Sequence, residues 1–454
     1  MPDGRCGAHQ DPALPEKRLR QGQPSRSRES TLAANRVLAP DRGRSRMLRH
    51  SPHRWKDMHR MTMQPTTTAS IPLLTHPRLR HAIGTALLGM GLLSMSPMAQ
   101  AIEVYKTDTD RVEFSGRLAA FAVIQDGAHD EVYNGGSRVR LIHEHQFEQG
   151  WSSIIRAEWG FDPWFKDGTD AHYKRMLYAG AAHEKWGSFT VGKQYGPWYD
   201  MVAVNTDWFW INGGEASGTF EGRSGDGGLH GTGRPDNSLY WKKGFGEFTV
   251  GLLYQLGHDG QHSNETSLFE DGVFTTETEY SGYERDYSYE AALNWHPNED
   301  VTVGGVFHHT ELSDYESGNS ENGDVDAWLL GGHWSPGNWY IALVGGEYRN
   351  HIAGSTLDSS KAFVDKARGA EFVINYKFKE VIWGDDSVEL YGGLNHLEDT
   401  DSEARYAYQI LGAAWRVKDL TLATEYRFDN SRQSDGSEYS ADRDQLMFLA
   451  RYDF

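Results

Sequence analysis

The most regular feature of this chain is an alternation of apolar and polar residues that begins at Arg111 and recurs to the carboxyl terminus. In the segment RVEFSGRLAAFAVI, Val112, Phe114 and Leu118 fall on one face, and Arg117 falls on the other. Successive side chains of a strand point to opposite faces, so this pattern predicts a strand with one apolar face. The complete set of sixteen predicted strands is 111–124, 137–148, 151–160, 173–184, 187–195, 236–243, 247–255, 286–296, 300–310, 325–335, 338–348, 368–379, 386–396, 405–416, 419–428 and 443–454.

The connections between these segments alternate in length. Short turns, such as Gln149-Gly150 and Val417-Lys418, alternate with long, polar and acidic stretches. Lipid offers no hydrogen-bond partners to the backbone, so a sheet that crosses a membrane must close on itself. We therefore predict an all-β fold: a 16-stranded antiparallel transmembrane β-barrel with short periplasmic turns and long extracellular loops. Sixteen strands enclose an aqueous lumen rather than a packed core.

The longest irregular stretch lies between Gly187 and Arg234, where about forty residues follow no regular period, far beyond ordinary loop lengths. It carries several large apolar side chains, including Trp198, Trp208 and Trp210. Apolar surface of this size is costly to leave in water and must pack against something. We therefore predict a third loop that folds inward and narrows the pore.

The first 101 residues differ in character from the rest. Residues 1–60 are rich in Arg, Ser and Pro without an apolar period, which favours an unstructured leader or a start assigned too far upstream. Residues 61–101 are typical of a signal peptide, with an apolar middle at Ala82–Met95 and a small-x-small cleavage pattern at Ala99 and Ala101. The alternative is a membrane anchor, but an anchor needs about twenty apolar residues, more than the stretch Ala82–Met95 supplies. The barrel would then occupy residues 102–454.

Composition excludes several classes of function. The formal net charge of −19 is the sum of +10 on residues 1–101 and −29 on the residues after them, and the strongly acidic later part argues against a nucleic-acid partner. The single cysteine, Cys6, lies in the leader, so the barrel has no thiolate chemistry. His143, His145, His308 and His309 are closely spaced, but no carboxylate partner is expected nearby, so we predict no metal site. Nucleophile and phosphate-binding motifs are absent from the sequence, and we predict neither a cofactor nor an enzyme.

The segment AGAAHEKWGSFTVGKQYGPWYD, residues 179–200, is similar to the region that leads into the third loop of the general porins of Gram-negative outer membranes. The aromatic carboxyl terminus, with Tyr452 and Phe454, resembles the signal that these porins present to the outer-membrane assembly machinery. The resemblance covers essentially all of residues 102–454. It implies a homotrimer whose third loop forms a constriction, with basic residues on the wall facing acidic residues on the loop.

The same resemblance assigns the residues of the constriction. WINGGEA stands in place of the acidic motif of the family, so Glu215 corresponds to its terminal acid, and Asp207 to an earlier one. Trp208 and Trp210 lie on the same stretch of loop. The basic side maps onto Arg117, Arg140, Arg175 and Arg234, with Arg156 as a further candidate.

Three classes of function remain after these exclusions. The first, which we predict, is a passive outer-membrane channel for small hydrophilic solutes and ions. The second is a substrate-selective porin for sugars or oligosaccharides, in which loop tryptophans would provide stacking surfaces. The third is an adhesin or enzyme that uses the barrel as a scaffold. The expected surroundings are outer-membrane lipid and lipopolysaccharide, the latter contacted by acidic loops through divalent cations.

Overall fold

The computed structural model describes residues 101–125, 131–163, 172–220, 227, 230–258, 262–270, 273–281, 283–314, 324–357, 363–438 and 444–454. The expected leader at 1–60 and all but the last residue of the expected signal peptide, including Ala99, lie outside this part of the chain. Ala101 is the first described residue, and the first strand begins directly after it.

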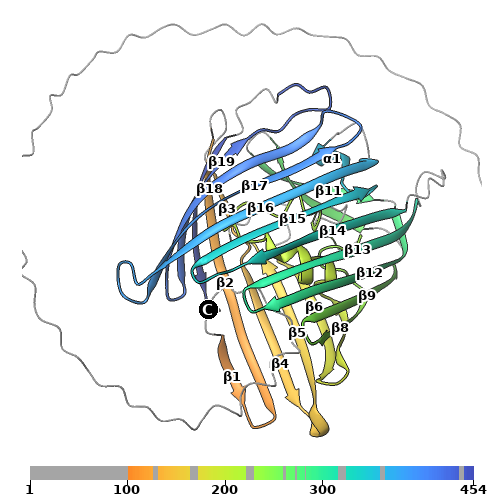
Figure 1. The fold of residues 1–454 in the computed structure, drawn as a ribbon, viewed down its shortest axis with the longest axis vertical. Coiled ribbons are helices and arrows are strands. Elements are labelled where there is room, and N and C mark those ends of the chain that lie inside the picture. Colours follow the sequence, from red (N-terminus) through yellow and green to blue (C-terminus); the bar gives the residue numbers. More distant parts are fainter. Residues whose placement is uncertain are drawn as a thin grey trace, which may run out of the picture. The chain divides into compact units, whose positions relative to one another are not determined.

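The wall of the molecule is one closed antiparallel sheet (Figure 1). Its 18 segments include β1 and β3, of five and four residues, which pair with β2 alongside longer strands. The remaining segments form a barrel of sixteen strands that closes where β2 pairs with β20. The predicted fold is therefore confirmed.

The sixteen long strands coincide with the sixteen predicted ones. They are β2 (Asp110–Ile124), β4 (Arg138–Gln146), β5 (Trp151–Phe161), β6 (His172–His183), β7 (Gly187–Lys193), β8 (Ser238–Phe245), β9 (Phe248–His258), β12 (Tyr283–Asn298), β13 (Val301–Asp314), β14 (Val325–Trp334), β15 (Trp339–Arg349), β16 (Lys366–Lys379), β17 (Asp386–Asp399), β18 (Arg405–Val417), β19 (Leu420–Asp429) and β20 (Gln445–Asp453).

Several shorter elements are present that the sequence pattern does not predict. Their bounds are β1 (Ile102–Lys106), β3 (Glu131–Asn134), β10 (His262–Glu270), β11 (Val273–Ser281), α1 (Gly354–Leu357) and the helical turns η1 (Glu148–Gly150), η2 (Trp198–Val202) and η3 (Ala203–Asn205). The β10–β11 pair forms a separate two-stranded sheet within the long connection from β9 to β12. No helix in the described ranges is long and apolar enough to cross a bilayer.

The two faces of the wall have opposite chemistry. On β14, Leu329 is fully buried, whereas the next residue, Leu330, is 59 % exposed on the outer face. The outer face carries further exposed leucines, among them Leu343 and Leu411. The inner face carries buried polar groups such as Glu371 and Asn395. An apolar exterior and a polar interior suit a barrel whose outside faces lipid and whose inside holds water.

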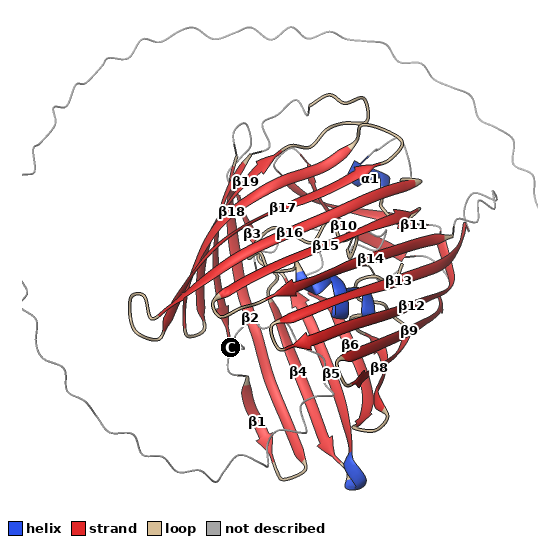
Figure 2. Cartoon of the chain, viewed as in Figure 1, coloured by secondary structure: helices blue, strands red, loops and turns tan. Residues whose placement is uncertain are grey.

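The third loop connects β7 and β8, and its described residues, 194–220, 227 and 230–237, lie inside the barrel. Figure 2 shows its helical turns within the ring of strands, and hydrogen bonds fix them to the inner wall. The Asn294 side chain on β12 donates to the Met201 carbonyl over 2.8 Å, and the Tyr340 hydroxyl on β15 donates to the Asn205 carbonyl over 2.7 Å. The inward fold of this loop is as predicted.

Candidate functional site

A cluster of arginines surrounds one carboxylate on the inner face of β4, β5 and β6. Glu158, whose side chain is only 1 % exposed, accepts hydrogen bonds from Arg140 over 2.8 Å, Arg156 over 3.2 Å and Arg175 over 2.9 Å. Arg138 lies 3.7 Å from the same carboxylate. Four guanidinium groups therefore share one counter-charge, and the cluster keeps a positive excess.

The register of the sheet explains this convergence. Arg140 lies directly opposite Glu158 in the pairing of β4 with β5. Between β5 and β6 the register shifts, so Glu158 pairs with Met176, and the following pair involves Lys174. Arg175 is the extra residue of this β-bulge, a feature that re-aims a side chain. The bulge brings the Arg175 Nε atom within hydrogen-bonding distance of Glu158.

The other two predicted basic residues border this cluster without contacting Glu158. Arg117 lies directly opposite Arg138 in the pairing of β2 with β4. Arg117 on β2 donates to Asp453 on β20 over 3.2 Å, and Asp453 also binds Arg451. Arg234 lies near the end of the third loop, where its guanidinium group is 5.9 Å from the ring centre of Tyr195 and 5.2 Å from that of Phe220. The structure thus brings Arg140, Arg156 and Arg175 onto one carboxylate, whereas Arg117 pairs with Asp453 and Arg234 lies against two aromatic rings.

Wall carboxylates hold the third loop against the strands from β12 to β19. Glu371 on β16 accepts hydrogen bonds from the Thr206 hydroxyl and from the Ser217 backbone amide, the latter over 2.8 Å. Both ends of the segment between them therefore meet at one side chain. We call this segment, residues 207–216, the distal lobe. Its return end is fixed further, because the Tyr348 hydroxyl donates to the Ala216 carbonyl over 2.6 Å.

The tip of the distal lobe is bound by Glu425 on β19. This carboxylate accepts hydrogen bonds from three consecutive backbone amides, those of Trp210, Ile211 and Asn212, over 2.8, 3.0 and 3.0 Å. It also accepts the Tyr391 hydroxyl over 2.8 Å. Hydrogen bonds to a charged acceptor are stronger than neutral ones, so this single side chain fixes the conformation of the tip.

The predicted loop residues lie on this lobe with partners of their own. Asp207 accepts the Tyr199 hydroxyl, and Glu215 accepts the Tyr408 hydroxyl. Burial raises the pKa of the Glu215 carboxyl. Burial and the adjacent Asp207 raise the pKa of Tyr199, whereas Arg138 acts in the opposite direction. This opposing effect indicates that the arginine wall and the start of the loop are electrostatic neighbours.

The two loop tryptophans contact the wall in different ways. Trp208 stacks on Tyr340 with ring centres 4.0 Å apart and an interplanar angle of 12°. Trp210 lies near two guanidinium groups, with Arg416 at 5.2 Å and Arg451 at 5.1 Å from its ring centre. Each of the two rings therefore contacts a group of the barrel wall.

The structure also shows charged groups at the candidate site that the pattern analysis missed. Arg138 and Glu158 had a visible signal, since each lies two residues from a predicted arginine and therefore on the same face of its strand. Glu371 and Glu425 had no such signal, because their role depends on contacts with a loop more than 150 residues away.

The closely spaced histidines have carboxylate partners that the sequence analysis did not expect, and that expectation was wrong. Asp110 lies 3.2 Å from His143 and 2.7 Å from His145. His308 faces Glu290, and His309 faces Asp326. Among the described residues, no group of three or more histidine, cysteine or acidic side chains is arranged to hold a metal ion.

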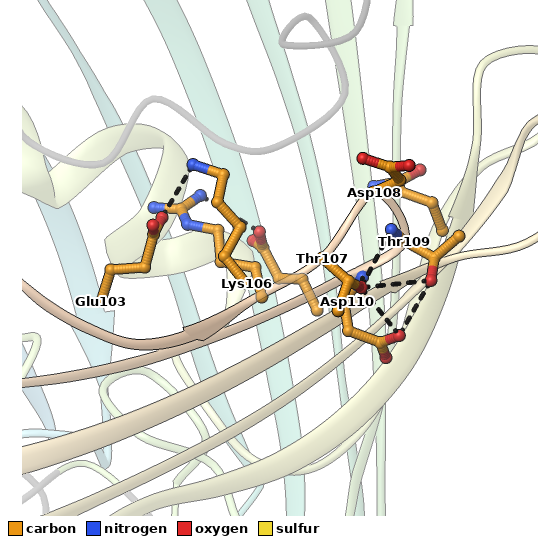
Figure 3. A pocket seen from close by; sticks show the side chains of 9 residues that line it. Glu103, Lys106, Thr107, Asp108, Thr109 and Asp110 are labelled. Atoms are coloured by element: carbon orange, nitrogen blue, oxygen red, sulfur yellow. Dashed lines mark hydrogen bonds and ion pairs between the residues drawn. The ribbon is translucent and has the colours of Figure 1, made fainter.

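A shallow pocket lies at the periplasmic end of the barrel, beside the turn from β1 to β2 (Figure 3). Two ion pairs lie in it: Lys106 binds Glu103 over 2.9 Å, and Arg111 binds Glu144 over 3.2 Å. Asp108 and Asp110 also line the pocket, so its charged lining is mainly acidic.

The carboxyl terminus lies at the seam of the barrel, the place where β2 pairs with β20. The Phe454 amide donates to the Gly116 carbonyl over 3.0 Å, and the Gly116 amide donates to the Phe454 carbonyl over 2.7 Å. A methyl group added at Gly116 would stand 2.4 Å from the Phe454 ring, so only glycine lets the terminal ring lie this close. Tyr452 is exposed on the outer face.

A polar lumen, an apolar exterior and a loop fixed across the interior define a channel-forming barrel of the outer membrane. The chain belongs to the Gram-negative porin family, whose family model matches residues 84–454. Among curated proteins it is similar to outer membrane protein YedS of Escherichia coli, at 22 % identity over 63 % of this chain and 74 % of that protein. It is also similar to outer membrane porin PhoE of Escherichia coli K12, at 23 % identity over 64 % of this chain and 77 % of that protein.

Solved structures agree on the fold. The chain is similar to Salmonella typhi OmpF in complex with daunomycin, with a TM-score of 0.60 and 17 % identity over 78 % of this chain and 100 % of that one. The protein is therefore a porin of the Gram-negative outer membrane that forms a water-filled channel.

Proposed function

We propose that the channel passes small hydrophilic solutes and ions by passive diffusion, through a constriction between the arginine cluster around Glu158 and the distal lobe of the third loop. The observation that carries this proposal is the sharing of one carboxylate by four guanidinium groups on the wall. The basic side would comprise Arg138, Arg140, Arg156 and Arg175. Asp207 and Glu215 would form the acidic side.

The charge balance at this constriction favours anions locally. Each acidic loop residue accepts a tyrosine hydroxyl, whereas the arginines hold a positive excess. A charge that lines a narrow passage acts on every passing ion at short range, while charges on exposed loops are screened within about 8 Å at physiological salt. We infer weak overall selectivity, cationic in dilute salt because the acidic loops gather cations, and neutral to anionic as the salt concentration rises.

The alternative of a sugar-selective porin receives no support from the tryptophans. Trp208 stacks on Tyr340, and Trp210 contacts two arginines, so both rings serve as contacts between the loop and the wall. The relatives are named as porins, which favours a channel over an adhesin or an enzyme. Saturable block of the current by sugars would favour the selective alternative instead.

The partners of the barrel are part of the proposal. A homotrimer in contact with lipopolysaccharide is consistent with an apolar groove on the outer face of β2, β19 and β20, lined by Ala120, Ala122 and Ala450 among others. The terminal residues Tyr452 and Phe454 would be read by the assembly machinery. Cleavage after Ala101 would leave Ile102, the first residue of β1, as the new amino terminus.

The test of the constriction is the double substitution Arg140→Ala and Arg175→Ala, measured as the reversal potential across a salt gradient. Loss of two cations should shift the reversal potential toward cation preference at every salt concentration. Arg368→Ala is the matched control, because Arg368 is 58 % exposed and pairs with Glu347. An unchanged reversal potential in the double variant would mean that these arginines do not line the narrowest passage.

A further inference from the structure

The turn between β16 and β17 presents apolar side chains at its tip. It comprises residues 380–385 and is the longest connection at the periplasmic end of the described wall. Three consecutive side chains in it are exposed: Val381 at 49 %, Ile382 at 59 % and Trp383 at 63 %. In Figure 1 the turn is the hairpin at the far left of the barrel wall. Apolar side chains gathered at one exposed place mark a contact surface, and the passage of solutes through the lumen does not account for this one.

The turn has a fixed shape, because one buried residue binds its backbone. The carboxylate of Asp386, which is 4 % exposed, accepts the Val381 amide over 2.8 Å and the Ile382 amide over 3.0 Å. The carbonyl of the same residue accepts the Glu380 amide over 2.8 Å. The amides behind the apolar tip therefore need no water, which suits surroundings that offer few hydrogen-bond partners.

The tip of the turn lies on the outer side of the wall. On β18, Arg416 faces the lumen and contacts a tryptophan of the third loop, so the preceding residue, Trp415, faces outward like the exposed Leu411. The Trp415 indole donates to Asp386 over 2.8 Å. The Trp383 ring packs against Trp415 with ring centres 4.8 Å apart. Trp383 therefore continues the apolar outer face of the barrel.

Aromatic rings on the same face locate the turn relative to the bilayer. Tyr376 on β16 contacts Trp339 and Phe378, with ring centres 4.7 and 4.6 Å apart. Such rings mark the edge of the apolar band of a membrane barrel. The last residue of β16, Lys379, is three positions beyond Tyr376, which is roughly 10 Å along the strand and about 7 Å along the membrane normal at the usual tilt. The headgroup layer is about 5–7 Å thick, so the turn begins at the level of the headgroups.

The exposed charges near the tip balance. Glu380 and Asp385 belong to the turn, Lys379 precedes it, and Lys418 lies in the neighbouring turn between β18 and β19. Two acidic and two basic side chains leave little net charge, so attraction to a charged partner does not explain the tip. Apolar contact does, and an indole ring favours the boundary between headgroups and acyl chains.

Two other occupants fit this surface less well. The apolar groove that would serve contact between copies lies on β2, β19 and β20, and β18 separates it from the strands of this turn. A soluble periplasmic protein would approach the rim from below, whereas the Trp383 ring lies against the outer face that contacts lipid.

We propose that the β16–β17 turn is an interfacial anchor, which inserts Val381, Ile382 and Trp383 into the phospholipid leaflet at the periplasmic side of the membrane. The ligand is the boundary between headgroups and acyl chains of uncharged-on-balance phospholipids. Anchoring at this turn fixes the depth of the barrel on one side. The inference concerns the outer surface and does not depend on the proposed path of solutes.

The experiment places an environment-sensitive fluorophore on the turn. Residues 102–454 contain no cysteine, so Ile382→Cys, combined with Cys6→Ser, provides one labelling site at an exposed position. The labelled porin is reconstituted into phosphatidylethanolamine vesicles that carry nitroxide quenchers either near the headgroup or deep in the acyl chain. We expect the headgroup quencher to act at least about twofold more strongly than the deep one, because an interfacial side chain is buried only about 5–10 Å.

Glu299→Cys is the matched control, since Glu299 is exposed in the turn between β12 and β13 at the same rim. Its label should be quenched by iodide in the water phase and at least about threefold less by the nitroxide lipids than the label at position 382. A second variant tests the cause: Val381→Ser and Trp383→Ser, added to the position 382 label, should reduce lipid quenching to the level of the control.

Three results would overturn the inference. The first is weak lipid quenching with full access of iodide at position 382, which would place the turn in water and leave it to a periplasmic protein. The second is equal lipid quenching at positions 382 and 299, which would make the turn no different from the rest of the rim. The third is unchanged quenching after Val381→Ser and Trp383→Ser, which would show that these side chains do not hold the turn in lipid.

Discussion

At the scale of single residues, Glu158 sets the charge of the proposed constriction. It is the shared partner of Arg138, Arg140, Arg156 and Arg175, so its removal changes the field of all four. Its nearly complete burial means that solvent screens this charge poorly. The Glu158 carboxylate therefore reduces the positive charge of the arginine cluster.

Glu158→Gln should make the channel more selective for anions. A unit charge about 6 Å from a passing ion contributes about 0.7 kcal/mol at the dielectric constant of water, with opposite sign for an anion and a cation. Its removal therefore changes the ratio of anion to cation permeability by roughly tenfold. The measurement is the reversal potential in a salt gradient. Glu347→Gln, which removes a carboxylate that pairs with Lys366 and Arg368, should leave the ratio unchanged. Equal shifts in both variants would contradict the assignment.

The residues of this cluster show how far a sequence can predict a site. Strand parity alone puts Arg140 and Arg156 on inner faces, and the same rule applied to Arg138 and Glu158 would have found them. Arg175 is different, because it is the extra residue of a bulge, and parity cannot predict the direction of a residue where the register shifts. The shared carboxylate depends on the register of three strands, which no single segment encodes.

At the scale of elements, the sixteen long strands were predictable because each carries its own alternation of apolar and polar residues. The short segments β1 and β3 were not, since five or four residues give too few positions to establish a period. The inward course of the third loop was predictable from its apolar content. Its anchors, Glu371 and Glu425, were not, because any inward-facing polar residue of sixteen strands could have served.

The distal lobe can be removed without separating the two ends of the remaining loop, because Thr206 and Ser217 both bind Glu371. Replacing residues 207–216 with two glycines should leave the rest of the third loop in place. The single-channel conductance should rise, roughly twofold, because sixteen strands alone enclose an open aqueous channel.

The matched control shortens an exposed loop in the same way. Gln433 and Ser437 are joined by a backbone hydrogen bond of 2.9 Å, so residues 434–436 can be excised there, and the conductance should not change. A distal-lobe variant that folds but conducts like the unaltered protein would show that the lobe lies away from the narrowest part of the lumen.

At the scale of the whole molecule, the carboxyl terminus decides whether the barrel closes. Deletion of Phe454 removes two backbone hydrogen bonds to Gly116 and the contact of its ring with Phe114, at 5.9 Å between ring centres. These losses amount to about 3 kcal/mol. The amount of folded barrel, measured by its heat-dependent mobility on gels, should fall sharply.

Replacing both Tyr452 and Phe454 with serine should lower the folded fraction as well. Tyr452→Ser alone separates the contribution of the Tyr452 ring from that of Phe454. It removes only an outward-facing ring and leaves the hydrogen bonds between Phe454 and Gly116 intact. Normal amounts of folded protein after loss of Phe454 would contradict both the structural and the assembly role of the terminus.

The seam between β2 and β20 also has a consequence for the order of events during biogenesis. It joins residues as far apart as Arg117 and Asp453, which are 336 positions apart, whereas every other pair of neighbouring strands in the barrel is linked by a turn or a loop. Contacts of such high separation carry the largest entropic cost and form late. Until the last strand has been translated and has met the first long one, β2 presents an open edge on which foreign strands could pair. Because of this strand order, the open edge of β2 must be protected until the protein has reached the outer membrane.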